Sequence, residues 1–183
     1  FKDLDVPPTL ISFAVDTAAV KGIISPELKK SGSRLVLYKA VRDQYEMPDF
    51  DNLKSAYAQI HAAIKNGQVL SAHTVGEGGL SLALSKMAFG NRIGLELNSE
   101  LTADELFSPD HGSILLEIDG DVSAAELFKG PEFSSIGRTI NDSKIIYGDM
   151  NLSIEELQNN WENTLERVFP TQTEAAEKIV ATE

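Results

Sequence analysis

The 183-residue chain contains no cysteine, which excludes disulfides, thiolate metal sites and cysteine nucleophiles. Histidine is scarce: only His61, His73 and His111 are present, and no pair has the close spacing of zinc ligands. Basic residues are also few, 16 against 28 acidic ones, giving a formal net charge of -12. Such a chain should be repelled by nucleic acid and by anionic membranes, so we expect neither as a partner.

Long apolar runs are missing as well. No stretch of about 18 apolar residues could form a membrane span, and the opening FKDLDVPPTL lacks the basic start and apolar core of a signal peptide. We therefore expect a cytoplasmic protein.

What is present is the composition of a globular domain, with 42% hydrophobic and 24% charged residues. Strand-like and helix-like segments alternate along the chain, which indicates an α+β fold. We expect one domain over residues 1–170, followed by a polar tail or linker over residues 171–183.

Hydrophobic patterns and capping signals predict the elements. Strands are expected at residues 9–20, 34–41, 69–75, 93–97, 113–119, 134–140 and 144–148. The last two should form a hairpin around Asn141 and Asp142, with residues 144–148 at the sheet edge. Helices are expected at residues 25–30 behind Ser25, 51–66 behind Asp49 or Asp51, 79–89 ending before Gly90, 102–107, and 153–168 behind Ser153.

The stretch Val75-Gly76-Glu77-Gly78-Gly79 joins an expected strand to an expected helix. Glycines at a helix N-terminus let backbone N–H groups approach a phosphate, where the helix dipole also favours negative charge. The stretch lacks the lysine of a Walker loop and the spacing of a dinucleotide fingerprint. Tight strand-to-helix packing requires glycines in the same way, so both interpretations stay open here.

Three side chains outside the glycines have two interpretations each. His73 could face a cleft or be a hydrogen-bonded structural residue, and His111 could be catalytic or belong to the turn around Pro109. Glu77 could ligate magnesium or place charge near the helix start. Trp161, with Phe169, is expected as a core anchor of the last helix. The sequence alone assigns no catalytic residue.

Two segments carry a specific resemblance: PPTLISFAVDTAAVKGIISPELKKSGSRLVLYKA and VLSAHTVGEGGLSLALSKMAFGNRIGLEL. They resemble the carboxy-terminal domain of the aminoimidazole ribonucleotide (AIR) synthetase superfamily. In that family a strand is followed by His-Asp-x-Ser-Asp-Gly-Gly-Leu, a helix and Glu-Met-Ala-Phe. His73, Gly78-Gly79-Leu80 and Met87-Ala88-Phe89 stand in register with that pattern.

The resemblance is strongest to the second such module of the large formylglycinamide ribonucleotide amidotransferases, and the ending NNWENTLERVFPTQT resembles the segment that precedes their glutaminase domain. It implies a three-layer α/β/α domain with a mixed sheet and partly ferredoxin-like topology. It implies a fragment, inactive alone, of an ATP-dependent ligase of purine biosynthesis that makes an amidine from formylglycinamide ribonucleotide, ATP and glutamine. The implied partners are an AIR synthetase-like N-terminal domain and a glutaminase domain beyond Glu183.

The resemblance also implies a role for the glycine turn. In relatives this turn contributes to an auxiliary, largely structural site for ATP or ADP with Mg²⁺, so the candidate nucleotide-binding residues are Thr74, Gly76, Glu77, Gly78 and Gly79. Thr74 replaces the metal-binding Asp, Gly76 replaces the Ser, and Glu77 keeps an acidic group as the one candidate metal ligand. We therefore expect a degenerate site, and the resemblance leaves open whether the fragment itself carries a cofactor. The turn at Pro109-Asp110-His111 replaces a Glu-Ser-Gln string that binds substrate in the sister module.

Two alternatives remain. One is a non-catalytic structural or regulatory module that has lost nucleotide affinity. The other is a module of a different superfamily member, such as selenophosphate synthetase, thiamine monophosphate kinase or a hydrogenase-maturation protein.

Overall fold

The computed structural model describes residues 8–98, 100–168 and 170. Its centre is a mixed seven-stranded sheet with strand order β2-β4-β1-β5-β3-β6-β7, in which β3 and β6 are parallel and the other neighbours are antiparallel. The strands are β1 (Arg34–Tyr38), β2 (Val69–Thr74), β3 (Gly94–Leu97), β4 (Ile114–Ile118), β5 (Phe133–Ile140), β6 (Lys144–Tyr147) and β7 (Met150–Ser153).

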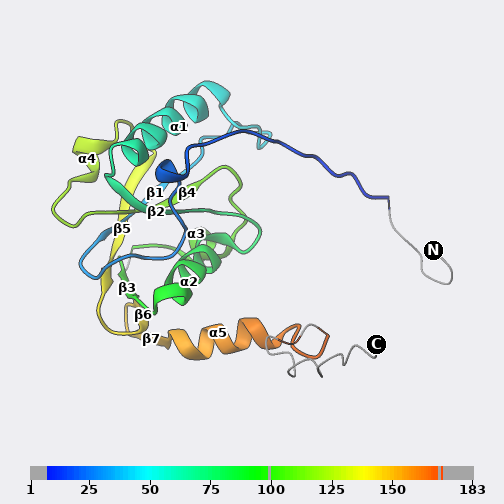
Figure 1. Ribbon diagram of the computed structural model, residues 1–183, viewed down its shortest axis with the longest axis vertical. Helices are drawn as coiled ribbons and strands as arrows, with labels where there is room; N and C mark the ends of the chain where they lie inside the picture. The colour runs from blue at the N-terminus through cyan, green and yellow to red at the C-terminus, as the bar shows by residue number, and fades with distance from the viewer. Residues whose placement is uncertain (1–7, 99, 169, 171–183) are drawn as a thin grey trace, which may run out of the picture.

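Helices lie on both faces of this sheet. They are α1 (Phe50–Lys65), α2 (Gly79–Asn91), α3 (Ala103–Phe107), α4 (Ala124–Leu127) and α5 (Ile154–Asn163), with a short 3-10 turn η1 at Val20–Gly22. In Figure 1, α1 and α4 lie above the sheet, and α2 and α5 lie below it. The expected three-layer α+β architecture with a mixed sheet is confirmed.

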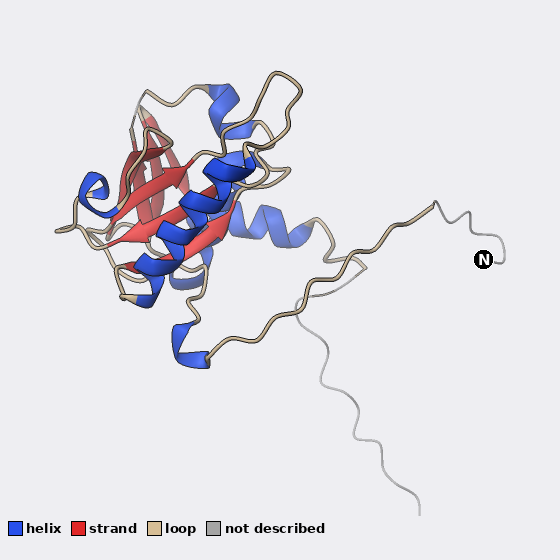
Figure 2. Cartoon of the chain, turned by 90° about the horizontal axis from the view of Figure 1, so that it is seen from above, coloured by secondary structure: helices blue, strands red, loops and turns tan. Residues whose placement is uncertain are grey.

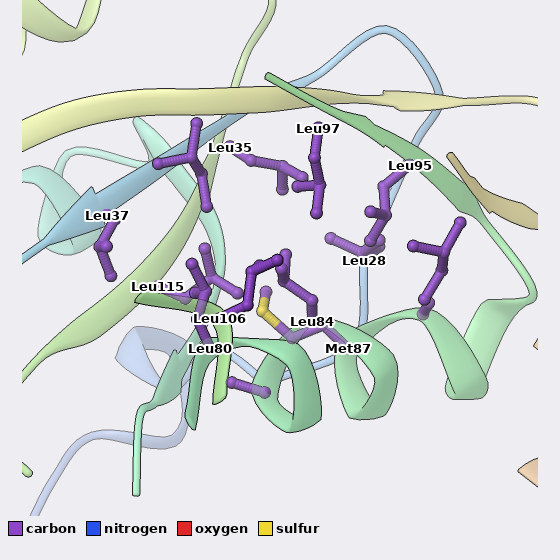
Figure 3. Close-up of a cluster of buried hydrophobic side chains, with 14 of the residues drawn as sticks. Leu28, Leu35, Leu37, Leu80, Leu84, Met87, Leu95, Leu97, Leu106 and Leu115 are labelled. Atoms are coloured by element: carbon purple, nitrogen blue, oxygen red, sulfur yellow. The ribbon is translucent and has the colours of Figure 1, made fainter. Parts of the chain in front are cut away.

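The central strand β1 explains why the sheet needs two helical layers. Leu35 and Leu37 are buried in the cluster against α2, whereas Val36 and Tyr38 are buried in the cluster against α1. A strand covered on both faces reads as a continuous apolar run, which is the pattern of Arg34–Tyr38. Figure 3 shows the α2 cluster, where Leu80, Leu84 and Met87 point up at Leu35, Leu95 and Leu115 of the sheet.

The two long helices begin where the sequence predicts. Asp49 caps α1 by accepting hydrogen bonds from the N–H groups of Asp51 and Asn52. Helix α2 buries the predicted face with Leu80, Ala83, Leu84 and Met87. It runs past Gly90 to Asn91 and is closed by Arg92 in the left-handed conformation, so the predicted stop at Gly90 is two residues early.

The expected elements before β1 are wrong. Residues 9–19 form no strand and run away from the body as an extended segment (Figure 2) with Leu10, Phe13 and Val15 exposed. Residues 25–30 form no helix, because their backbone groups bond to the domain instead of to each other. The Leu28 N–H donates to the carbonyl of Met87, and the N–H groups of Lys29 and Lys30 donate to the Glu117 carboxylate.

The predicted hairpin of residues 134–140 and 144–148 is also wrong. Strand β3 inserts between β5 and β6, and β6 then pairs with β7, an edge strand that the sequence pattern did not predict. Turn residues between two strands indicate a hairpin, but they cannot show that β3, which comes earlier in the chain, lies between β5 and β6.

The last helix begins behind Ser153 as predicted but ends at Asn163, with turns up to Val168. Trp161 is not a core anchor, because 51% of its side chain remains exposed. It instead lies on the surface beside Phe89, with ring centroids 6.0 Å apart, and under the Lys86 ammonium. Phe169 and the expected tail at residues 171–183 lie outside the described residues.

Candidate functional site

The glycine turn lies at the end of β2, between the sheet and α2. The Val75 N–H donates to the carbonyl of Ser113, and the Gly79 N–H donates to the carbonyl of Gly76 across the turn. The Asp110 N–H also approaches the Gly76 carbonyl at 3.4 Å. These bonds fix the turn against the loop that leads into β4.

The glycines of the turn differ in what they are needed for. Gly79 has a φ of +64°, and a Cβ there would lie 2.6 Å from the backbone oxygen of Leu106. A Cβ on Gly78 would lie 2.3 Å from the Leu82 side chain, whereas one on Gly76 would meet nothing within 4 Å. Packing against α3 therefore explains Gly79, but not Gly76.

Helix α2 begins at this turn without a side-chain cap. Gly78 is the N-cap and makes no side-chain hydrogen bond, and the first turn of α2 contains no acidic residue. This arrangement would tolerate an anion at the helix start. It does not by itself identify one.

Glu77 and His111 are brought together by the fold, although 34 residues separate them in the sequence. The Nε2 of His111 lies 3.0 Å from a carboxylate oxygen of Glu77, and the two side chains are 61% and 84% exposed. The Arg42 guanidinium donates to the His111 carbonyl, and the Tyr57 hydroxyl donates to that of Gly112 at 2.9 Å. The loop around His111 is thus bonded to Glu77, Arg42 and Tyr57. These contacts join distant parts of the chain, so local sequence patterns do not show them.

Thr74 and His73 are the last two residues of β2. Thr74 is exposed at the end of β2. His73 lies opposite Leu115 of β4, and its Nδ1 is 2.6 Å from the carbonyl of Thr74. That contact fits the structural interpretation of His73 and leaves no catalytic partner beside it among the described residues.

Among the described residues, few side-chain oxygens lie beside Glu77 as further ligands for a magnesium ion. Hard cations of this kind prefer several carboxylate or carbonyl oxygens. The described part of the chain holds no cluster of three or more His, Asp or Glu side chains that could bind a metal. Glu77 stands beside an imidazole instead of a second carboxylate, so its role as a metal ligand stays a prediction.

A polar hollow adjoins the turn on the side of α3. Its volume is about 520 Å³, and it is bounded by the loop after β1 and by residues 104–110. Lys39 and Arg42 line it together with the acidic side chains of Asp43, Glu46, Asp104, Glu105 and Asp110. Of these residues only Asp110 could be singled out from the sequence, as part of the turn at Pro109-Asp110-His111; the others come together through the packing of the loop after β1 against α3.

A fully buried carboxylate lies elsewhere, near the end of β4. Glu117 is fully buried and accepts hydrogen bonds from the Lys29 N–H, the Lys30 N–H and the Ser71 hydroxyl. A buried carboxylate is tolerated only when donors surround it in this way. Glu117 therefore ties residues 29–30 to the sheet.

One known protein family matches most of this chain. The family model of the AIR synthase related protein, C-terminal domain, matches residues 15–147. Among curated proteins, the phosphoribosylformylglycinamidine synthase subunit PurL of Lactobacillus delbrueckii subsp. bulgaricus is 35% identical over 121 residues, which are 64% of this chain and 16% of that protein. The same subunit of Lactobacillus helveticus is 25% identical over 166 residues, 87% of this chain and 22% of that protein. The chain thus spans less than a quarter of the length of these relatives.

Solved structures show the same fold. Phosphoribosylformylglycinamidine synthase II of Thermotoga maritima aligns with a TM-score of 0.59 at 14% identity, over 75% of this chain and 28% of that one. HypE of E. coli, a hydrogenase maturation protein, aligns with a TM-score of 0.54 at 13% identity, over 72% of this chain and 51% of that one. At these identities the likeness concerns the fold alone.

Proposed function

The chain belongs to the family of AIR synthase related proteins, as their C-terminal domain, and on that premise we propose that it is a domain of a phosphoribosylformylglycinamidine synthase. Such an enzyme makes formylglycinamidine ribonucleotide from formylglycinamide ribonucleotide, ATP and glutamine in purine biosynthesis. The observation that carries the proposal is the sequence similarity of this chain to curated proteins of that name, 35% identity over 121 residues in one case.

The described residues favour a supporting role in that reaction. They contain no nucleophile activated by a base and no metal cluster, and the His111–Glu77 pair is open to solvent. We therefore propose that the isolated domain has no activity and that it helps to hold the synthase together. No chemical step is assigned to its side chains.

The turn of Thr74, Gly76, Glu77, Gly78 and Gly79 is, in this proposal, the frame of a degenerate nucleotide site. Related T. maritima enzymes have been crystallised with ATP and with ADP. The strand, turn and helix of such a frame are present here. The side chains at positions 74 and 76 nevertheless offer neither a carboxylate nor a serine hydroxyl, which supports a site that holds nucleotide weakly or not at all.

An apolar groove supports the view that another module covers this domain. The groove has a volume of about 270 Å³ between α2, α3 and the β6–β7 edge, and its lining is almost wholly apolar. Phe107 and Met150 in its wall are 65% and 52% exposed. Exposed apolar surface of this kind marks an interface. We propose that the covering modules belong to the same enzyme, namely an AIR synthetase-like N-terminal domain and a glutaminase carried on the same chain or on a separate subunit.

No described helix is both long and apolar enough to cross a bilayer. From the acidic composition we propose that the enzyme works in the cytoplasm and binds neither nucleic acid nor membranes.

A domain exchange tests the proposal. Residues 9–168 of this chain would replace the matching segment of the L. delbrueckii PurL subunit, and amidine formation would be assayed with formylglycinamide ribonucleotide, ATP and ammonia. We expect the exchanged enzyme to retain activity. The matched control replaces the same segment with the corresponding domain of E. coli HypE, which has this fold at 13% identity, and should be inactive.

Equal loss of activity in both exchanged enzymes, with both folded, would contradict the proposal. A regulatory module is the second candidate, because Thr74 and Gly76 have lost the ligand-type side chains. It predicts instead that the exchanged enzyme keeps its basal rate but loses a response to added ADP.

A further inference from the structure

The hollow between α4 and β5 has a charge pattern unlike the rest of the molecule. Its volume is about 450 Å³, and its lining includes two cations, Arg34 and Lys129, two serines, Ser123 and Ser135, and no carboxylate. The chain as a whole has 28 acidic residues against 16 basic ones. A hollow that gathers cations and hydroxyls in so acidic a protein is a candidate site for an anion.

Arg34 is placed there by the strand register. It begins β1 and lies directly opposite Arg138 of β5, and Val36 lies opposite Ser135. Since directly paired residues and residues two apart share a face of the sheet, the two arginines and Ser135 all lie on the α1–α4 face. Like charges directly opposite each other are destabilising. The Glu96 carboxylate, opposite Arg138 on β3, offsets this repulsion from the far side.

Only one of the two arginines has a carboxylate partner. Arg138 donates to Glu96 from Nε at 2.9 Å and from Nη2 at 2.6 Å. Arg34 donates from Nε to the carbonyl of Gly120 at 3.0 Å, which fixes the guanidinium. Within the described residues its Nη groups have no hydrogen-bond partner, so they remain able to bind a ligand.

The Lys129 backbone is held by α1, whereas the side chains of Lys129 and Ser123 have no hydrogen-bond partner among the described residues. Gln59 of α1 clamps the backbone of Lys129 on both sides, accepting from its N–H at 2.8 Å and donating to its carbonyl at 3.2 Å. Ser123 precedes α4 but makes no capping hydrogen bond through its side chain. Across the part of the chain that the structure describes, neither the Lys129 ammonium nor the Ser123 hydroxyl has a partner.

The remaining wall of the hollow is apolar and rigid. The rings of Phe128 and Phe133 stack with centroids 4.6 Å apart and planes 7° apart, and Ala124 lies beside them. The nearest carboxylate, that of Glu132 next to Gly130, accepts a hydrogen bond from Asn52 of α1 at 2.9 Å. That bond gives the carboxylate a partner on α1.

We propose that this hollow binds a small organic phosphate, with the phosphate group between Arg34 and Lys129 and its apolar part against Phe128 and Phe133. A phosphate monoester carries a charge of about -1.5 to -2 near pH 7, which matches two cations better than a carboxylate does. Arg34 can offer it two parallel N–H groups. The site is independent of the glycine turn: Ile118, opposite Arg34, and Ile114, opposite Thr74, are at opposite ends of β4.

Phenyl phosphate is the probe for this site, titrated into the ¹⁵N-labelled 183-residue chain at constant ionic strength while amide shifts are followed by NMR. We expect saturable shifts confined to residues around α4, the start of β1 and β5. Arg34→Gln and Lys129→Gln should each weaken binding about tenfold, the typical effect of losing one charge-assisted contact. Lys54→Gln removes the same charge from the exposed face of α1 and should leave the affinity within about twofold of the unmodified chain.

Benzoate and inorganic phosphate identify the part of the ligand that is recognised. The proposal expects inorganic phosphate to bind more weakly than phenyl phosphate, and benzoate to bind more weakly still. Three results would overturn it: no saturable shift up to about 10 mM phenyl phosphate, shifts centred on residues 74–79 instead, or equal weakening by Lys54→Gln and Lys129→Gln. Arg34→Lys, which keeps the charge but not the fork, should recover part of the affinity, and this separates ligand binding from a folding defect.

Discussion

A Cβ placed on Gly79 would stand 2.6 Å from the carbonyl oxygen of Leu106, because α3 closes directly over the turn that begins α2. This contact joins two elements that are 27 residues apart and gives the glycine turn a structural role that needs no ligand.

The first prediction compares the effects on stability of replacing Gly79 and Gly76 in the turn. Gly79→Ala combines a φ of +64° with a backbone clash and should lower the free energy of unfolding by about 2–4 kcal/mol. Gly76→Ala has open space around it and should change stability by less than about 0.5 kcal/mol. Urea unfolding of both variants measures the difference. Equal effects would mean that the packing explanation of the turn is wrong.

The second prediction concerns the buried carboxylate. Glu117→Gln keeps the shape but turns one acceptor into a donor facing N–H groups, so it should destabilise the domain by about 2–3 kcal/mol. Glu96→Gln, which breaks the exposed pair with Arg138 in the same sheet, should cost less than about 1 kcal/mol. Hydrogen exchange should also show the N–H groups of Lys29 and Lys30 losing protection in Glu117→Gln alone.

The third prediction is for the Glu77–His111 pair. Both side chains are largely exposed, so Glu77→Gln or His111→Gln should change the unfolding free energy by no more than about 0.5 kcal/mol. Thermal unfolding of the two single variants and the double variant gives the coupling between them. A coupling above about 2 kcal/mol would show that the loop contact holds the site together more strongly than its exposure suggests.

The fourth prediction concerns acid. The Ser25 hydroxyl, the backbone N–H of Glu27 and the Lys29 ammonium hold the pKa of Glu27 at about 2, and hydrogen bonding from Lys30 lowers the pKa of Asp119. A carboxyl whose pKa is lower in the folded state stabilises the fold above its unfolded pKa, and that contribution is lost as pH falls through the folded value. Stability should therefore fall between about pH 5 and pH 2. Glu27→Gln should flatten this slope, and so should high salt, since Glu27 is exposed. If the pH dependence of stability is unchanged in Glu27→Gln, the lowered pKa of Glu27 does not contribute to it.

The fifth prediction concerns the apolar groove. Phe107→Ser and Met150→Ser change side chains that are more than half exposed, so the isolated domain should keep its stability within about 1 kcal/mol. Light scattering should show less self-association, while the exchanged synthase carrying the same changes should lose activity. Full activity in that enzyme would mean that the groove is not an interface.

The sequence allowed the parts of this molecule that depend on local patterns to be predicted. Asp49 and Ser153 begin helices where their side chains can cap, and the buried face of α2 follows helical spacing. The strand predicted at residues 9–20 is wrong, because a segment rich in Val, Ile, Phe and Thr forms a strand only where a partner strand is available. Residues 144–148 were predicted as a strand, and β6 confirms them; only their pairing with β5 was wrong, because β3 from a distant part of the chain lies between the two strands.

The site was predictable to a similar extent. The glycine turn could be located from its position between a strand and a helix. The contact of Glu77 with His111 and the cationic hollow at Arg34 and Lys129 depend on loop packing and strand register, which no local motif encodes.

We propose above all that this domain supports a phosphoribosylformylglycinamidine synthase through a turn that packs against α3 and holds nucleotide weakly or not at all. The most direct test is the rate of amidine formation by the exchanged enzyme that carries Thr74→Ala together with Glu77→Gln. The account predicts a rate within about twofold of the unmodified exchanged enzyme, since neither side chain touches the reaction. A loss of about tenfold or more, with the protein folded and the ATP dependence altered, would contradict it and show that the turn still binds nucleotide.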